Sequence, residues 1–229
     1  MISMKNTITL FLIAMVSLTS IAQKATTKEL ESFTQIKAYD RIVVKLVKST
    51  VNKIVISGDD QDEINISNKD GVLKVKMEFD NFMDGDEAQA TLYYSEPLTL
   101  IDANENAKIT SDETVKGERI EIKAQEGGKI NLKIALADVY VKSISGSVIV
   151  LNGSSATQEV MVNTGGRVEN EKLTSEKTKV VVNAGGRANI KSSDEVEAKV
   201  RAGGYIYIHG NPKNVKSDKV FGGKIVVVE

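Results

Sequence analysis

The amino-acid sequence predicts an all-β protein, folded as a single-stranded β-helix or β-solenoid with rungs of about 18–21 residues. Pairs of glycines recur at nearly constant spacing in the second half of the chain, and a short strand of alternating apolar and polar residues follows each pair. Windows with apolar residues at the three-and-four spacing of a helix are few. Aromatic residues make up 5% of the chain and tryptophan is absent, so we expect a core of valine and isoleucine, which is typical of thin strands.

The repeat is marked by its glycines, which suit corners because they adopt a positive φ without steric cost. The pairs are Gly127-Gly128, Gly165-Gly166, Gly185-Gly186, Gly203-Gly204 and Gly222-Gly223, with Ser145-Gly146 in the one gap. The second members of successive pairs are separated by 18, 20, 20, 18 and 19 residues. Asn106-Ala107 is interpreted as a degenerate earlier copy.

The strand after each pair has a period of two, which is typical of a strand with one buried face. We expect its second position to face the core at Ile130, Val148, Val168, Ala188, Ile206 and Ile225. Two strands and a corner cannot bury an apolar face alone, but rungs stacked about 4.8 Å apart can. The main alternative is a β-sandwich of hairpins, which predicts no fixed register of glycines.

Residues 1–22 are typical of a secretory signal peptide. Lys5 is followed by an apolar stretch from Ile8 to Leu18, and Ser20-Ile21-Ala22 fits a cleavage site with small residues. A buried N-terminal helix is the alternative, but the sequence becomes polar abruptly at Gln23. We therefore expect cleavage after Ala22 and a mature protein that is periplasmic, on the cell surface or extracellular.

The composition limits the kinds of anchor and partner. Cysteine is absent, so stability cannot come from disulfides, and the chain has no cysteine for a lipoprotein anchor. No segment after the leader is long and apolar enough for a membrane helix. The net charge of −1 supplies no strong field for nucleic acid.

Residues 23–104 differ from the repeats, because their strands are longer and lack the glycine register. The expected strands are Ile42–Val47, Ile54–Ile56, Ile64–Ile66, Val72–Val75 and Ala90–Tyr94. We expect this region to cap the solenoid formed by residues 105–229, since an uncovered edge invites pairing with other chains. No linker rich in proline or serine separates the two parts, so residues 23–229 are expected to form one continuous domain.

In these features the chain resembles the head GIN domain family, also called putative auto-transporter adhesins, a domain of unknown function in exported bacterial proteins. The resemblance covers residues 30–229 and includes the serially spaced glycine turns. It also rests on Phe33-x-x-Ile36, the Asp70–Val75 turn and strand, Pro97-Leu98 and Gly210-Asn211-Pro212, with Gly128-Lys129-Ile130-Asn131 nearest to the Gly-Ile-Asn pattern of the family name. The resemblance implies a β-helix and no established activity, cofactor or catalytic residue.

One column of outward-facing residues is the candidate binding site. Residues that precede the expected core positions face solvent, and they are Lys129, Ser147, Arg167, Arg187, Tyr205 and Lys224. This basic ladder could bind an anionic polymer such as an acidic glycan, with Tyr205 and Tyr207 as stacking platforms. The alternative is that the cations only keep the sheet soluble and prevent aggregation.

Other candidate sites lack the residues that their chemistry needs. His209 is the only histidine, so neither a zinc site nor a Ser-His-Asp triad can be built, and we expect no cofactor. The acidic loop Asp80–Glu87 could attract Ca²⁺ but lacks the spacing of an EF-hand, as does Asp59–Glu63. The short rungs leave no room for the long loops of a carbohydrate-active enzyme on a β-helix. The predicted function is therefore a non-enzymatic binding or adhesion surface for a glycan or protein, with such an enzyme or a structural envelope component as alternatives.

Overall fold

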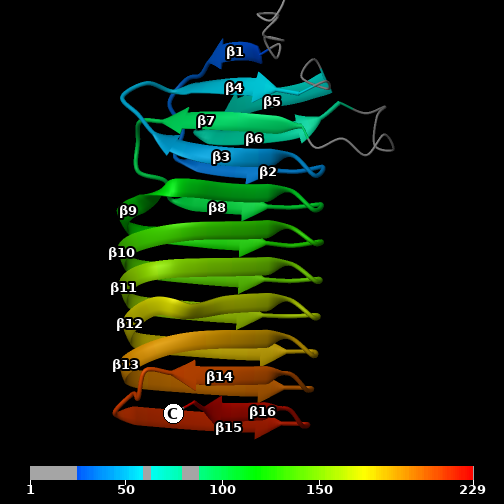
Figure 1. Cartoon of the computed structure of the whole chain (residues 1–229). Coiled ribbons are helices and arrows are strands. Elements are labelled where there is room, and N and C mark those ends of the chain that lie inside the picture. The colour runs from blue at the N-terminus through cyan, green and yellow to red at the C-terminus, as the bar shows by residue number, and fades with distance from the viewer. Residues whose placement is uncertain (1–24, 59–62, 79–87, 229) are drawn as a thin grey trace, which may run out of the picture.

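The computed structural model describes residues 25–58, 63–78 and 88–228, and the predicted signal peptide and the acidic loop at 80–87 lie outside them. The chain forms a β-solenoid of about seven turns, whose rungs lie one above another from β1 at one end to β15 and β16 at the other (Figure 1). The predicted fold class is confirmed. The strands are β1 (Ala25–Glu29), β2 (Gln35–Ala38), β3 (Val43–Lys48), β4 (Lys53–Ser57), β5 (Ile64–Lys69), β6 (Val72–Met77), β7 (Gln89–Tyr94), β8 (Leu100–Ala103), β9 (Lys108–Ala124), β10 (Lys129–Ser143), β11 (Val148–Val162), β12 (Arg167–Asn183), β13 (Arg187–Arg201), β14 (Tyr205–His209), β15 (Asn214–Val220) and β16 (Lys224–Val227).

Each rung has a tight turn at one edge of the stack and a gradual bend at the other (Figure 1). In β10, the inward-facing positions change phase between Leu136 and Val139, so the strand bends there. Its first part lies in one sheet and its second part in the opposite sheet. We call these the post-turn sheet (β3, the first parts of β9–β13, β14 and β16) and the pre-turn sheet (β2, β8, the second parts of β9–β13, and β15).

The tight turns have two consecutive residues with positive φ, which is the type I′ geometry. In the turn before β10, Glu126 and Gly127 have φ of 53° and 77°, and the N–H of Gly128 donates to Gln125 O over 2.9 Å. The turn at Glu105-Asn106 has the same geometry, so the predicted degenerate copy is confirmed. A further copy at Asp40-Arg41, which carries neither glycine nor asparagine, was not predicted from the sequence.

The position of one rung was predicted wrongly. In the turn before β11, Ser145 and Gly146 have positive φ, so Ser147 and not Gly146 corresponds to the second glycine of the other pairs. The sequence assigned Ser147 to the solvent and Val148 to the core, whereas Ser147 is fully buried and Val148 is half-exposed. The side chain of Ser147 is accommodated because its hydroxyl donates to Ala124 O over 2.8 Å and accepts from Ile144 N over 3.0 Å.

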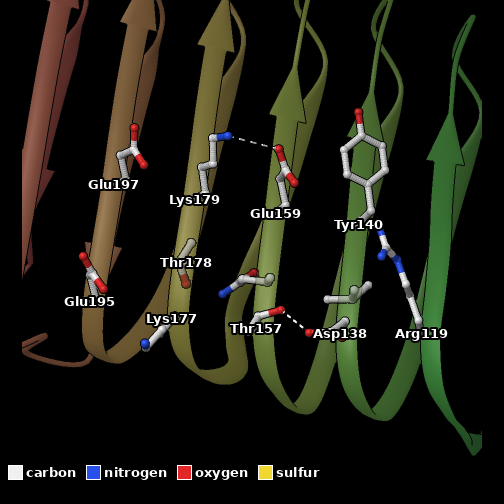
Figure 2. A pocket seen from close by; sticks show the side chains of 12 residues that line it. Arg119, Asp138, Tyr140, Thr157, Glu159, Lys177, Thr178, Lys179, Glu195 and Glu197 are labelled. Carbon is white, nitrogen blue, oxygen red and sulfur yellow. Dashed lines mark hydrogen bonds and ion pairs between the residues drawn. The ribbon is translucent and has the colours of Figure 1, made fainter.

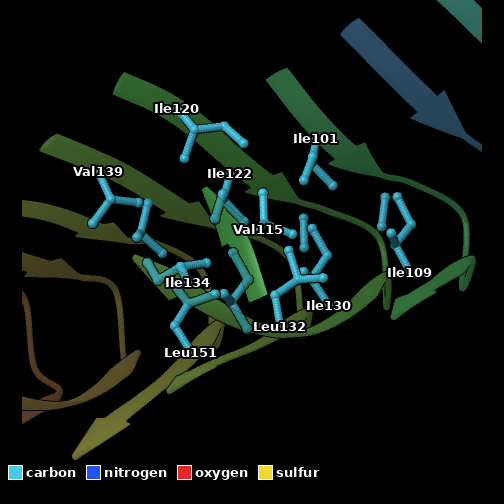
Figure 3. Close-up of a cluster of buried hydrophobic side chains, with 14 of the residues drawn as sticks. Ile101, Ile109, Val115, Ile120, Ile122, Ile130, Leu132, Ile134, Val139 and Leu151 are labelled. Atoms are coloured by element: carbon cyan, nitrogen blue, oxygen red, sulfur yellow. The ribbon is translucent and has the colours of Figure 1, made fainter. Parts of the chain in front are cut away.

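Neighbouring rungs pair in parallel, so equivalent apolar residues form columns inside the stack. Ile109, Ile130, Ile149, Val168, Ala188 and Ile206 form one such column, and every one of these side chains is buried. Figure 3 shows the apolar side chains of several rungs meeting between the two sheets. Because each rung covers the apolar face of its neighbours, the core is continuous along the stack.

A group of polar side chains interrupts this core where β12 carries extra residues relative to β11 and β13. Gln158 is central: its amide donates to Ser175 Oγ over 2.9 Å and to Lys191 O over 3.1 Å, and it accepts from Asn170 Nδ2 over 3.3 Å. Asn170 in turn accepts from Leu151 N over 3.2 Å. These contacts satisfy backbone groups that the irregular pairing would otherwise leave without partners.

The N-terminal strands extend the stack and then change direction. β6 and β7 pair in parallel with β2 and β3, and beyond them β5, β4 and β1 pair antiparallel. The five strands predicted in this region correspond to β3, β4, β5, β6 and β7. Within the described residues, no helix is long and apolar enough to cross a membrane.

Candidate binding face

The outward column of the post-turn sheet begins with Lys129 and follows the parallel register of the rungs. The residues in register with it are Val148, Arg167, Arg187, Tyr205 and Lys224. Arg167 and Arg187 are direct neighbours on adjacent strands, as the stacked rungs require. Val148, and not the predicted Ser147, occupies the position between Lys129 and Arg167, so the column is apolar there.

The column continues toward the N-terminus by one rung. Lys108 of β9 lies in register with Lys129, although it is only half-exposed. Lys108 was not predicted as part of the column. It directly follows the degenerate turn Asn106-Ala107, just as Lys129 directly follows Gly127-Gly128.

Two tyrosines of β14 contact one arginine of the column. Tyr205 and Tyr207 of β14 have parallel rings, with centroids 6.4 Å apart and an interplanar angle of 9°. The guanidinium carbon of Arg187 lies 5.6 Å from the Tyr205 centroid and 5.9 Å from the Tyr207 centroid. The aromatic faces therefore stabilise this cation and restrict its guanidinium, which still lies on an exposed residue.

Four exposed cations of this column form no ion pair with a carboxylate of the described residues. Among the described residues, Lys129, Arg167, Arg187 and Lys224 form no ion pair within 4.0 Å. The nearest carboxylate in the sequence pattern, Glu169, accepts a hydrogen bond from Asn189 instead. The charges of these four residues are thus not neutralised by a neighbouring acid, whereas elsewhere on the same sheet Lys45 pairs with Asp112 over 2.5 Å.

The pre-turn sheet differs, because there cations and carboxylates alternate from rung to rung. Lys179 lies 3.6 Å from Glu159, and Lys199 lies 2.5 Å from Asp218. A depression of about 390 Å³ lies on this sheet, and Figure 2 shows the side chains that line it. Among them, Thr157 donates to Asp138 over 2.5 Å. Its charged groups largely compensate one another, so this sheet attracts ions of either sign less strongly than the post-turn sheet.

A carboxyl pair at the turns was not predicted from the sequence. The side chains of Asp40 and Glu105 lie at the tips of adjacent turns and hydrogen-bond to each other. This bond, with desolvation and the charges of Asp40 and Glu126, raises the pKa of Glu105 to about 7. Asp40 also accepts from the N–H of Met77 over 3.1 Å. The Glu105 carboxyl therefore stays partly protonated near neutral pH.

Of the remaining candidates, the structure describes only His209 and Glu63. His209 is half-buried at the end of β14, and its Nε2 has no hydrogen-bond partner among the described residues. In the part of the chain that the structure describes, no three histidine, cysteine or acidic residues are grouped so that they could hold a metal ion. Of the stretch Asp59–Glu63, only Glu63 is among the described residues.

Comparison with protein families assigns the repeats and most of the N-terminal strands to one known group. The sequence model of the family described as "Putative auto-transporter adhesin, head GIN domain" matches residues 32–212, which is well over half of the chain. No curated protein matches the chain.

Solved structures with the same architecture include proteins from Bacteroides and Parabacteroides. A putative adhesin from Bacteroides fragilis has a TM-score of 0.81 at 17% identity, covering 90% of this chain and 97% of that one. A putative adhesin from Parabacteroides merdae has a TM-score of 0.73 at 16% identity, covering 88% and 94%. A putative lipid binding protein from Parabacteroides distasonis has a TM-score of 0.65 at 14% identity, covering 88% and 96%. At these identities the likeness establishes the shared fold alone.

Proposed function

Since the chain belongs to the head GIN domain family of putative auto-transporter adhesins, we propose that it is an exported, non-enzymatic adhesion protein whose post-turn sheet binds an acidic glycan. The family name supports an adhesion-type surface protein. The glycan and its site are our inference from the geometry, as is export through the predicted signal peptide at residues 1–22.

One observation carries the proposal: four cations without a carboxylate partner among the described residues are aligned along one sheet, and two stacked tyrosines lie beside one of them, Arg187. Adjacent rungs are about 4.8 Å apart, so a polymer along the solenoid axis meets a new side chain of the column at each rung. Arginine binds carboxylate and sulfate groups through paired N–H donors. Tyr205, which is 44% exposed, offers an edge and a hydroxyl beside the polymer.

A carbohydrate-active enzyme is the second candidate, and the carboxyl pair at Asp40 and Glu105 is the feature that could favour it. Glycoside hydrolysis needs two carboxyl groups at least about 5 Å apart, so that the scissile bond fits between them. Asp40 and Glu105 instead hydrogen-bond to each other, and no sugar fits between them. We therefore favour binding over hydrolysis.

Binding to immobilised polysaccharides tests the proposal. The probes are polygalacturonate and heparin, with neutral dextran as the uncharged reference. The test variant is Arg167→Ala/Arg187→Ala, and the matched control is Lys177→Ala/Lys179→Ala, which removes the same charge from the exposed surface of the pre-turn sheet.

We expect wild type and control to bind at least one acidic probe with similar affinity and to ignore dextran. The arginine variant should bind about tenfold or more weakly, because two charge-assisted contacts are lost. Equal loss in both variants would show a diffuse charge effect and reject the site. Absence of binding by wild type to every acidic glycan would reject the glycan itself.

A further inference from the structure

The last rung of the solenoid has two strands that each pair on one side only. Among the described residues, β15 pairs only with β13, and β16 pairs only with β14. Their other edges present free N–H and C=O groups, which are a template for a further strand. Apolar side chains are also exposed there: Phe221 is 89%, Val227 47% and Val215 39% exposed.

Phe221 departs from the other residues at the tips of the turns. The equivalent first turn positions of the four preceding rungs hold Ser145, Thr164, Ala184 and Ala202. Only the last rung places a large apolar side chain at this corner, next to the unpaired edges. This concentration of apolar surface at one end indicates that the end is covered in solution.

The sequence of β15 is complementary to itself when it is reversed. In an antiparallel pair centred on Ser217, Lys216 of each copy lies opposite Asp218 of the other. Both side chains face outward, in register with Glu197 and Lys199 of β13. Two opposite-charge pairs form across the edge, where a parallel pairing would place lysine beside lysine.

The sequence of β16 is complementary about the same axis. Ser217 and Val226 each lie three residues from the turn Val220–Gly223, so one twofold axis perpendicular to the sheets passes near both. Around Val226, the inward-facing Ile225 of one copy then lies opposite Val227 of the other. The open ends of the two apolar cores meet, and the partly exposed Ile225 and Val227 become buried.

We propose that two copies of this chain associate end to end through β15 and β16 around this twofold axis. The two solenoids then form one longer stack with a continuous core. Lys219 is the one charged residue at an inward position of the last rung, and it lies opposite Val215, whose surface its aliphatic stem can cover. The contact is closed on itself, because the twofold axis uses the β15 and β16 edges of both copies at once, so association through this end stops at the dimer.

The axis also determines where the binding columns lie. A twofold perpendicular to the sheets leaves the post-turn sheets of both copies on the same side of the dimer. If the proposed function is correct, one polymer can contact both columns, and its avidity exceeds that of a single column.

Light scattering coupled to size exclusion tests the dimer without relying on glycan binding. The single variants Lys216→Asp and Asp218→Lys each place like charges opposite each other in a homodimer. Mixed in equal amounts, they restore both opposite-charge pairs between the two different chains. Circular dichroism confirms that each variant keeps its strand content.

At about 100 µM, we expect wild type to have twice the mass of one mature chain, which is the 24.9 kDa chain without its signal peptide. Each single variant should be monomeric, and their mixture should recover the dimer mass. This recovery separates a specific pairing from unfolding of the last rung, which mixing cannot repair. A monomeric wild type, a dimer in both single variants, or a mixture that stays monomeric would each overturn the proposal.

Discussion

Gly165 and Gly166 are adjacent, yet the structure requires glycine at the two positions for different reasons. Gly165 has a φ of +69°, and a Cβ added there has no atom within 4 Å. Gly166 does not have a positive φ, but a Cβ there would lie 2.5 Å from Ser143 O and 2.7 Å from Ser143 C. Substitution at Gly165 therefore strains only the backbone, whereas substitution at Gly166 forces two rungs apart.

The magnitudes follow from these two situations. Gly165→Ala should lower the free energy of unfolding by about 1–2 kcal/mol, the cost of the left-handed region for an ordinary residue. Gly165→Asn should cost less, because asparagine tolerates this region and Asn106 occupies it at the equivalent turn position, with a φ of 61°. Gly166→Ala should cost about 2–3 kcal/mol through overpacking, and Gly166→Asn at least as much.

Thermal unfolding followed by circular dichroism measures the four variants. At about 2–4 °C per kcal/mol, Gly166→Ala should lower Tm by about 4–12 °C, and Gly165→Asn should change it by less than about 2 °C. Ser147 shows that a side chain can occupy the position of Gly166 in another rung, but its hydroxyl bonds there to Ala124 O and to the Ser143 hydroxyl, each over 2.8 Å, and alanine can form neither bond. Equal Tm values for Gly165→Asn and Gly166→Asn would contradict the different roles of the two glycines. So would a lower Tm for Gly165→Ala than for Gly166→Ala.

Three further predictions concern the core and the turns. Gln158→Ala removes hydrogen bonds to buried groups such as Asn170, so urea unfolding should show a loss of about 1–3 kcal/mol; no loss would mean that water replaces the amide. Ile149→Ala, in the middle of an apolar column, should cost about 2–5 kcal/mol in the same assay, and a smaller loss would show that the rungs collapse onto the cavity. The pKa of Glu105 is raised from 4.5 to about 7 in the folded protein, so its stabilising contribution is present below pH 4.5 and is lost as pH rises through 7. Glu105→Gln should therefore raise Tm by about 1–3 °C at pH 8, a value reduced for solvent screening, and should leave Tm nearly unchanged at pH 4.5. If the variant and wild type differed in Tm by the same amount at both pH values, the raised pKa of Glu105 would be contradicted.

The glycine register was sufficient to predict the stacking, because each turn requires residues that tolerate positive φ and close packing. It was not sufficient at Ser147, where a hydrogen-bonded serine replaces the second glycine. A strand has a period of two, so this error of one residue exchanged the predicted inside and outside at Val148. A polar residue that is buried through its own hydrogen bonds cannot be distinguished from an exposed one by a pattern of polarity.

The sequence by itself determined the solenoid class, the spacing of its rungs and the alignment of Arg167 with Arg187, because these depend on local conformation and on a repeat that adds the same step each time. Only the tertiary structure decided which charges are compensated and which segments distant in the chain meet. Asp40 and Glu105 come together because β2 pairs with β8, although five strands, β3 to β7, lie between them in the chain. Arg187 packs against Tyr205 and Tyr207 because side-chain orientation, and not register alone, brings a cation over a ring.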